Sequence, residues 1–338
     1  MLRQVAMARM QLQRGEAAGA AELLGPVLAA EPDNVGALVL MTHVQLALRK
    51  PELALETAER AVRNAPESPE SLTALSRVQT ALHRHEPAIE TARAAVLREP
   101  ENPYRHNRLA WALLEEGVRL IDAEHAAREA IRLDPGEADF RITYAMVMKA
   151  LQLPDRARQA LRDALEREPD NAIARHELAA FDVVHRNPFA LSRLARGAAG
   201  LAGALRADPS QEASRSLLDA ALRQFLVYTA IILVVLAYLG WQVADDSAAG
   251  ARVLAAAAAL VPAAYAGYFV ARLDRGLRAY LKDVLSRRRI AGLTTAVTLL
   301  LLLAATVAPA EWLTELLAAA TIAGFAVRLL TAVVPRAV

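Results

Sequence analysis

The chain contains no cysteine among its 338 residues. This absence excludes disulfide bonds, thiolate metal sites and cysteine nucleophiles. An excess of charge is also missing, since 39 Lys and Arg stand against 37 Asp and Glu. Residues 225–338 hold 10 basic and 6 acidic residues (+4), and the remainder holds 29 against 31 (−2). The basic isoelectric point is therefore partly a property of the C-terminal third, and we predict no nucleic-acid partner.

Motifs of catalysis and cofactor binding are also missing. The sequence has no glycine-rich phosphate loop and no nucleophile elbow. His83 and His85 stand beside Glu86 at an expected turn, but no third and fourth metal ligand is evident. His176-Glu177 lacks the second histidine four residues later that a zinc-protease helix requires. We predict no catalytic residue, no metal site and no cofactor.

Prolines recur along the first half of the chain at intervals of 34, 34, 35 and 34 residues. Each lies in a similar short phrase of acidic and small polar residues, such as Glu-Pro-Asp-Asn. The five prolines are Pro32, Pro66, Pro100, Pro135 and Pro169. A fixed period of this length indicates one supersecondary unit stacked on copies of itself.

Small residues recur in register with these prolines. Positions twelve, eight and five residues before each proline share one helical face, where alanine allows close approach of a neighbouring helix. They are Ala20, Ala54, Ala88, Ala123 and Ala157; Leu24, Ala58, Ala92, Ala127 and Leu161; Val27, Ala61, Ala95, Ala130 and Ala164. An earlier helix in each unit places a large residue before a small one, from Met7-Ala8 to Tyr144-Ala145. Each unit therefore reads as helix A, turn, helix B and a proline turn that ends helix B.

This pattern of small residues and a terminal proline resembles the tetratricopeptide repeat (TPR) family over residues 1–171. The resemblance implies an all-α fold, a TPR-type α-solenoid. The family's large aromatic residue early in helix A is absent here. A sixth, distorted unit is expected over 172–210, so that the solenoid spans 1–210, and residues 211–224 are expected to form a capping or connector helix.

Beyond Phe225 the composition becomes strongly apolar. Four stretches of about twenty mainly apolar residues each have the length needed to cross a bilayer. They predict transmembrane helices at 225–243, 253–271, 290–308 and 313–334, the last containing Glu315 and Arg328. Buried core helices are the alternative interpretation, with more weight for the second and fourth.

The connection between the second and third spans is basic, whereas the other two connections are acidic. By the positive-inside rule the basic loop remains in the cytoplasm, which places the solenoid and both termini there. The loop is expected either to contact anionic lipid as an amphipathic helix or to act only as a topological anchor. Its basic residues include Arg275, Arg278, Lys282, Arg287, Arg288 and Arg289. The composition, rich in Ala, Arg and Leu, favours a multi-pass protein of a bacterial inner membrane.

The TPR resemblance implies a concave groove lined by the A helices. The residues expected to face it are Arg9, His43, Arg77, Tyr104, Asn107, Trp111, Ile142, Met146, Lys149 and His176. Arg and Trp are frequent among residues that dominate binding energy, although Trp111 could instead pack against the next repeat. We interpret the chain as a membrane-anchored adaptor that recruits a protein or peptide, and not as an enzyme. The alternative is a regulatory or structural subunit of a transporter or channel.

Overall fold

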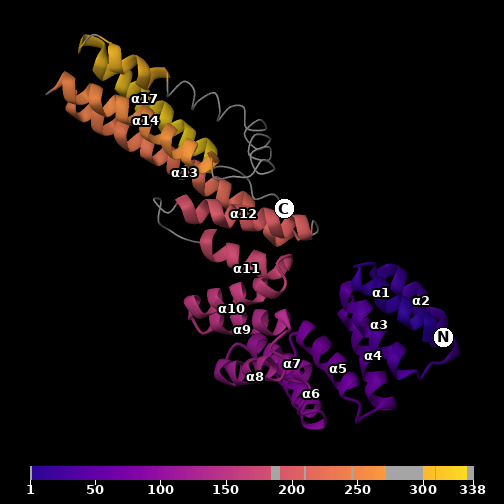
Figure 1. Cartoon of the computed structure of the whole chain (residues 1–338). Helices are drawn as coiled ribbons and strands as arrows, with labels where there is room; N and C mark the ends of the chain where they lie inside the picture. Colours follow the sequence, from indigo (N-terminus) through magenta and orange to yellow (C-terminus); the bar gives the residue numbers. More distant parts are fainter. Residues whose placement is uncertain are drawn as a thin grey trace. The chain divides into compact units, whose positions relative to one another are not determined.

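The structure, a computed structural model, describes residues 2–183, 191–208, 211–244, 247–271, 300–308 and 310–332. Every named element within them is an α-helix (Figure 1). The elements are α1 (Leu2–Gln13), α2 (Ala17–Ala30), α3 (Val35–Ala47), α4 (Pro51–Asn64), α5 (Pro69–Ala81), α6 (His85–Arg98), α7 (Pro103–Glu116), α8 (Leu120–Leu133), α9 (Ala138–Ala150), α10 (Pro154–Arg167), α11 (Ala172–Val183), α12 (Leu191–Ala207), α13 (Glu212–Val243), α14 (Ala248–Ala271) and α17 (Ala310–Ala332).

The chain divides into two compact units, Met1–Pro169 and Asp170–Val338. The first unit holds five helix pairs, α1/α2 to α9/α10, and matches the five regular repeats expected from the prolines. The pair α11/α12, which corresponds to the expected sixth repeat, belongs to the second unit. The turn expected at residues 187–189 lies outside the described residues.

Small residues form the contact between the two helices of each repeat. All fifteen positions named above from the proline register are at most 1% exposed. The facing small residues of the A helices, from Ala8 to Ala145, are equally buried, and two of them are polar. Thr42 Oγ1 donates to Leu38 O at 2.9 Å and Ser76 Oγ donates to Ala88 O at 2.8 Å, so neither hydroxyl is left without a partner. The prediction of close helix packing is confirmed.

Successive repeats are joined by turns that end one helix and cap the next. Helix α2 ends two residues before Pro32, and the other B helices end in the same place relative to their prolines. Asn34 Oδ1 then accepts a hydrogen bond from Ala37 N at 3.0 Å and caps α3. Ser68 and Asn102 cap α5 and α7 in the same way. The repeated phrase after each proline is therefore mainly a helix start signal.

Within each repeat, the turn from helix A to helix B passes through a left-handed residue. Glycine fills this position twice, with φ of 81° at Gly15 and 79° at Gly117. Arg49, His83 and Gln152 fill it in the other repeats, with φ between 56° and 60°. The left-handed residue lets the chain turn back and cap the C-terminus of helix A. After α9, for example, Leu153 N donates to Met148 O at 2.9 Å across the turn.

We expect Gln152→Gly to stabilise the protein by about 0.5–1 kcal/mol, because a residue with Cβ is strained at positive φ. The reverse change, Gly117→Ala, should cost about 1 kcal/mol for the same reason. Denaturant titration followed by circular dichroism measures both. Gly25→Ala in α2, where an added Cβ meets nothing within 4 Å, is the control and should not destabilise. Equal effects of the two alanine substitutions would contradict the explanation.

The A helices of neighbouring repeats pack directly on one another: α1 on α3, α3 on α5, α5 on α7 and α7 on α9. Each B helix packs mainly on the A helix of its own repeat and on that of the next. Closer spacing on the A side bends the stack toward the A helices, which therefore form its inner wall.

In the second unit, α11 and α12 approach closely over glycine. A Cβ added to Gly197 would lie 2.6 Å from Val183 Cγ2 and 3.0 Å from Ala179 O. The core continues through α13 and α14, where the rings of Phe225 and Phe269 stack with centroids 4.1 Å apart. The expected connector (211–224) and the first expected span (225–243) lie in one continuous helix of 32 residues, α13. No helix-breaking residue separates the two segments. Phe225, the expected first residue of that span, is 4% exposed and packs in this core.

Two helices within the described residues, α13 and α14, are long and apolar enough to cross a bilayer. They contain the first and second expected spans. Of the third span, residues 300–308 are described, and Leu302 and Ala305 pack with α13, α14 and α17. The fourth span falls mostly on α17, which is not one of those two helices. Arg275, Arg278, Lys282, Arg287, Arg288 and Arg289 lie outside the described residues.

Candidate partner-binding groove

The inner wall of the first unit carries nine of the ten predicted groove residues. Arg9, Arg77 and Lys149 are exposed on α1, α5 and α9, and Trp111 on α7 is half-buried. The remaining members of the wall are His43, Tyr104, Asn107, Ile142 and Met146. His176 lies on α11 in the second unit, where its Nδ1 is 2.7 Å from Ser214 Oγ. His176 is therefore not part of the inner wall of the first unit.

Three of these residues are partly or wholly engaged within the protein. Ile142 is 4% exposed, so it is a core residue that offers no accessible surface to a partner. Tyr104 is 54% exposed, but its hydroxyl donates to Glu137 Oε2 at 3.1 Å and its ring meets Phe140 edge-on. Asn107 Oδ1 is buried without a hydrogen-bond partner. Trp111 is neither fully packed nor fully exposed, which leaves part of the indole accessible.

His43 lies among cations on this wall. Its pKa is lowered to about 4 by burial first, and then by the positive charges of Arg77 and Arg9. Its Nε2 is buried without a hydrogen-bond partner. At neutral pH this imidazole is therefore uncharged, and the positive charge of the wall comes from arginine.

This shift makes stability depend on pH between the unfolded pKa of 6.5 and the folded value of about 4. In that window the unfolded chain binds a proton at His43 and the folded chain does not, so stability falls as the pH is lowered. In wild type, we expect His43 to lower the free energy of unfolding by about 2–3 kcal/mol between neutral pH and pH 4. His43→Gln should lose this decrease. Hydrogen exchange of α3, followed by mass spectrometry at several pH values, measures this loss.

A second variant, at Arg77, tests whether the charge of this arginine contributes to the low pKa of His43. Arg77→Gln should raise the pKa of His43 and so reduce the acid sensitivity without abolishing it. If His43→Gln left the pH dependence of α3 exchange unchanged, burial and the arginines would not control this histidine.

Two charged residues that sequence reasoning missed complete the wall. Arg108 on α7 is only 7% exposed, and its Nη2 donates to Thr80 Oγ1 at 2.7 Å. Asp139 on α9 is exposed and interacts electrostatically with Arg77. A usable signal for Arg108 is its register, because earlier repeats have Ala6, Leu40 and Ala74 at the same position. A charge where the three earlier repeats have apolar residues is the signal, and the fifth repeat has the polar residue Thr143 at this position.

Burial and like charge act together on these arginines. The pKa of Arg108 is lowered to about 9, by burial first and then by Arg77, against the opposing effect of Glu115. The pKa of Arg77 is also lowered by the surrounding protein, although its side chain remains open to solvent, and Asp139 opposes this shift. Burial raises the pKa of Asp139, as do Glu137 and Glu168, while Arg77 lowers it. The wall thus brings positive charges together at a place where the surrounding protein reduces their contact with water.

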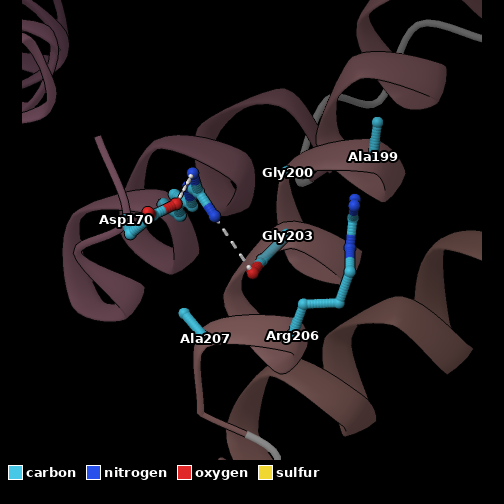
Figure 2. Close-up of a pocket in the computed structure, with 7 residues that line it drawn as sticks. Asp170, Ala199, Gly200, Gly203, Arg206 and Ala207 are labelled. Carbon is cyan, nitrogen blue, oxygen red and sulfur yellow. Dashed lines mark hydrogen bonds and ion pairs between the residues drawn. The ribbon is translucent and has the colours of Figure 1, made fainter.

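A separate open hollow lies in the second unit, against α12 (Figure 2). Its lining includes Asp170, Arg175 and Arg206. Arg175 Nη2 pairs with Asp170 Oδ1 at 2.6 Å and its Nη1 donates to Gly203 O at 3.3 Å. The guanidinium of Arg175 is therefore already occupied, and we assign no ligand to this hollow. Within the described residues, no group of three or more metal-binding side chains is present.

Family comparison agrees with the repeat geometry. Residues 11–78 and residues 138–181 each match a tetratricopeptide-repeat family profile. The chain carries TPR repeats. No curated protein matches the chain.

Solved TPR structures resemble this fold. A thermophilic TPR protein of Thermus thermophilus shares 26% sequence identity at a TM-score of 0.50, and the match covers 56% of this chain and 98% of that one. A chain of the APC/C hetero-tetramer Cut9–Hcn1 gives a TM-score of 0.53 at 16% identity, covering 65% of this chain and 42% of that one. These likenesses support the all-α TPR-like solenoid, and TPR folds commonly bind proteins or peptides.

Proposed function

We propose that this protein is a membrane-anchored adaptor, whose TPR groove binds a protein or peptide while helices of the second unit hold it in a bilayer. The observation that carries the proposal is the uncovered apolar surface of α13 and α14 on a chain with TPR repeats. Only 27% of the apolar stretch of α13 and 35% of that of α14 are buried within the protein. A core helix of a water-soluble protein would be mostly covered.

The side chains on these helices fit a lipid environment. Val235 is 48% exposed, Val253 is 69% exposed and Leu260 is 66% exposed. Exposed apolar surface of this extent is unfavourable in water and favourable in hydrocarbon. Tyr238 and Trp241, with ring centroids 5.8 Å apart near the end of α13, match the aromatic residues found at membrane interfaces. The basic residues of 272–289 would then orient the solenoid toward the cytoplasm.

The groove supplies the recruiting surface. Arg77 and the accessible part of Trp111 belong to the residue types that dominate binding energy. Anchoring the solenoid raises its effective concentration near membrane-bound partners, so moderate affinity is sufficient. The mechanism is binding, and it requires no catalytic step.

A transport role lacks a specific supporting observation. Thr229, Thr306 and Thr321 each donate a hydroxyl to a carbonyl of their own helical segment, at 2.9, 2.6 and 2.8 Å. Their hydroxyls are therefore used locally and do not indicate a polar path. We retain the adaptor as the proposed function.

Membrane insertion is tested by tryptophan quenching in vesicles of brominated phosphatidylcholine. The full chain carries three tryptophans, and two variants each retain one: Trp111→Phe/Trp312→Phe retains Trp241, and Trp241→Phe/Trp312→Phe retains Trp111. We expect quenching of Trp241 and no quenching of Trp111. Equal, unquenched emission from both, with release of the protein by alkaline carbonate, would refute the anchor.

Partner recruitment is tested by crosslinking in intact membranes, affinity purification and mass spectrometry. The Arg77→Glu/Trp111→Ala variant should lose a protein that wild type captures. The matched control is Arg93→Glu/Leu97→Ala on α6, a B helix, where Leu97 is 81% exposed. A partner retained by the groove variant but lost by the control would move the binding face to the B helices. If wild type captured no partner, the adaptor proposal would fail.

A further inference from the structure

One face of α1 is uncovered, although the same face is buried on the A helix of every other repeat in the first unit. Met10 is 53% exposed. The residues at its position on the other A helices are at most 1% exposed, and they are Val44, Val78, Ala112 and Val147. All five residues are apolar, so the exposure of Met10 follows from its place in the first repeat and not from its residue type.

Two further positions of α1 show the same difference. Arg3 and Ala6 are exposed, and with Met10 they are spaced by three and four residues, so the three share one helical face. The equivalent residues of the other A helices are at most 7% exposed. They are Ala37, Ser71, Arg105 and Phe140 for Arg3, and Leu40, Ala74, Arg108 and Thr143 for Ala6. We refer to Arg3, Ala6, Met7 and Met10 as the end face of α1.

In the later repeats, the B helix of the preceding repeat covers this face. Ala37, Leu40 and Val44 of α3 belong to one apolar cluster with residues of α2. Val78 of α5 packs with Ala54 of α4 in the same way. Helix α1 itself packs mainly on α2 and α3, which leave its end face open. The end face therefore corresponds to the surface that elsewhere receives a B helix.

The fourth repeat shows which charge suits an arginine in this register. Arg105, at the position of Arg3, donates from Nε to Glu99 Oε2 at 2.9 Å and from Nη2 to Glu70 Oε1 at 2.6 Å. Both carboxylates belong to the preceding repeat, and Glu99 is the C-cap residue of its B helix, α6. Arg3, by contrast, has no ion pair within the described residues. A helix docked on the end face could therefore supply a carboxylate to Arg3 as α6 does to Arg105.

The apolar part of the end face is unusual for the first repeat of a stack. Terminal repeats of solenoids carry a polar outer face, which keeps them soluble. Here Met7 is 45% exposed beside Met10. Methionine is flexible and is frequent on surfaces that bind helices of varied sequence. An exposed apolar surface of this kind marks an interaction site.

We propose that the end face of α1 binds an amphipathic helix of a partner protein, and that an acidic residue of this helix pairs with Arg3. The bound helix takes the place of a preceding B helix. Charge favours such a partner over a second copy of this chain, because α1 contains arginines and no acidic residue, so two copies of the face would repel each other. The end face is separate from the groove of the proposed adaptor, and the inference goes beyond that function.

The proposal is tested with synthetic helices titrated against the full chain in detergent. Three fluorescein-labelled peptides of about 18 residues, long enough to be helical alone, share an apolar face of leucine and alanine. Their flanks carry glutamate, glutamine or lysine. Fluorescence anisotropy reports binding, and detergent without protein gives the background. Light scattering of each protein measures its mass, and thermal unfolding is followed in parallel.

We expect wild type to bind the glutamate helix at least about tenfold more tightly than the lysine helix. Met10→Gln should weaken binding of the glutamate helix by about tenfold, because it places a polar group in the apolar contact. Leu97→Gln on α6, where Leu97 is 81% exposed, is the matched control and should bind as wild type does. Both side chains are largely exposed, so neither change should alter the unfolding temperature.

A second pair of variants tests the ion pair. Arg3→Gln should reduce the preference for glutamate over glutamine flanks, whereas Arg9→Gln, which removes an exposed arginine of the same helix, should keep it. Equal loss in the two variants would show general attraction to a basic helix and would remove the Arg3 pair.

Three results would overturn the end face as a site for a partner helix. The first is equal binding of the glutamate and lysine helices by wild type. The second is equal binding of the glutamate helix by Met10→Gln and Leu97→Gln. The third is a wild type of dimeric mass that becomes monomeric in Met10→Gln, which would make a second copy the occupant.

Discussion

Phe140→Ala should destabilise the repeats around α9 by about 3–5 kcal/mol, the usual cost of removing a fully buried aromatic ring. Phe140 is 0% exposed and is the largest fully buried side chain in the first unit. Its ring meets Tyr104 edge-on, with centroids 5.1 Å apart. Because each repeat contacts mainly its neighbours, the loss should be local. Hydrogen exchange should rise in α7 to α10 and change little in α1 to α4.

The control for this prediction is Tyr104→Phe. It keeps the ring contact and removes only the exposed hydrogen bond to Glu137, so we expect a change within about 0.5 kcal/mol. Uniform loss of protection across all five repeats after Phe140→Ala would contradict a stack with nearest-neighbour coupling. An unchanged exchange pattern would contradict the central position of this ring.

Arg105→Ala should cost about 3 kcal/mol, because it removes a buried guanidinium that joins two repeats. Arg105 is 7% exposed, and it donates to Glu99 Oε2 at 2.9 Å, Thr73 Oγ1 at 3.1 Å and Glu70 Oε1 at 2.6 Å. Denaturant unfolding of the full chain, followed by circular dichroism, measures the loss. Arg98→Ala is the matched control: Nη2 donates to a carboxylate one repeat away at 2.6 Å, but the side chain is 48% exposed. We expect its effect to stay within about 0.5 kcal/mol.

The Arg105 interaction also has a pH signature. Burial raises the pKa of Glu70, but its own backbone amide, Arg105 and Ser68 lower it, and the net shift is downward from 4.5. A carboxyl with a lowered folded pKa stabilises the protein above its unfolded pKa, and this contribution is lost as the pH falls through the folded pKa. The difference in free energy of unfolding between wild type and Arg105→Ala should therefore become smaller below pH 4.5. A difference that stayed constant into strong acid would show that Arg105 acts by packing alone.

Much of the first unit could be predicted from the sequence because its signals are local. Ala20, Ala54 and Ala88 are spaced by one repeat, and all three are fully buried in the structure. Their burial follows from helix periodicity within about twelve residues of each proline. The turn chemistry is equally local. Asn34 as a helix cap and Gly117 as a left-handed residue can both be read from residue type and register.

The candidate site was less predictable because it depends on burial between helices. The rule that assigns groove positions pointed to Arg77 and Trp111 but also to Ile142, which is buried. It omitted Arg108, whose surroundings come from α5, one repeat earlier in the chain. Whether an arginine is exposed, paired or buried without a counter-ion depends on side chains about 30 residues away. No local pattern records this.

For this protein, the sequence by itself determined the period, the helix pairs, the close packing of alanines and the existence of long apolar helices. Each of these depends on the residue order within one or two helical turns, or on simple apolar length. Only the tertiary structure decided that residues from Asp170 onward form a second compact unit and that α13 runs unbroken from the connector into the apolar region. It also decided that Arg108 is buried without a counter-ion. Burial and charge pairing are set by which helices meet in space, and that information is distributed over several repeats.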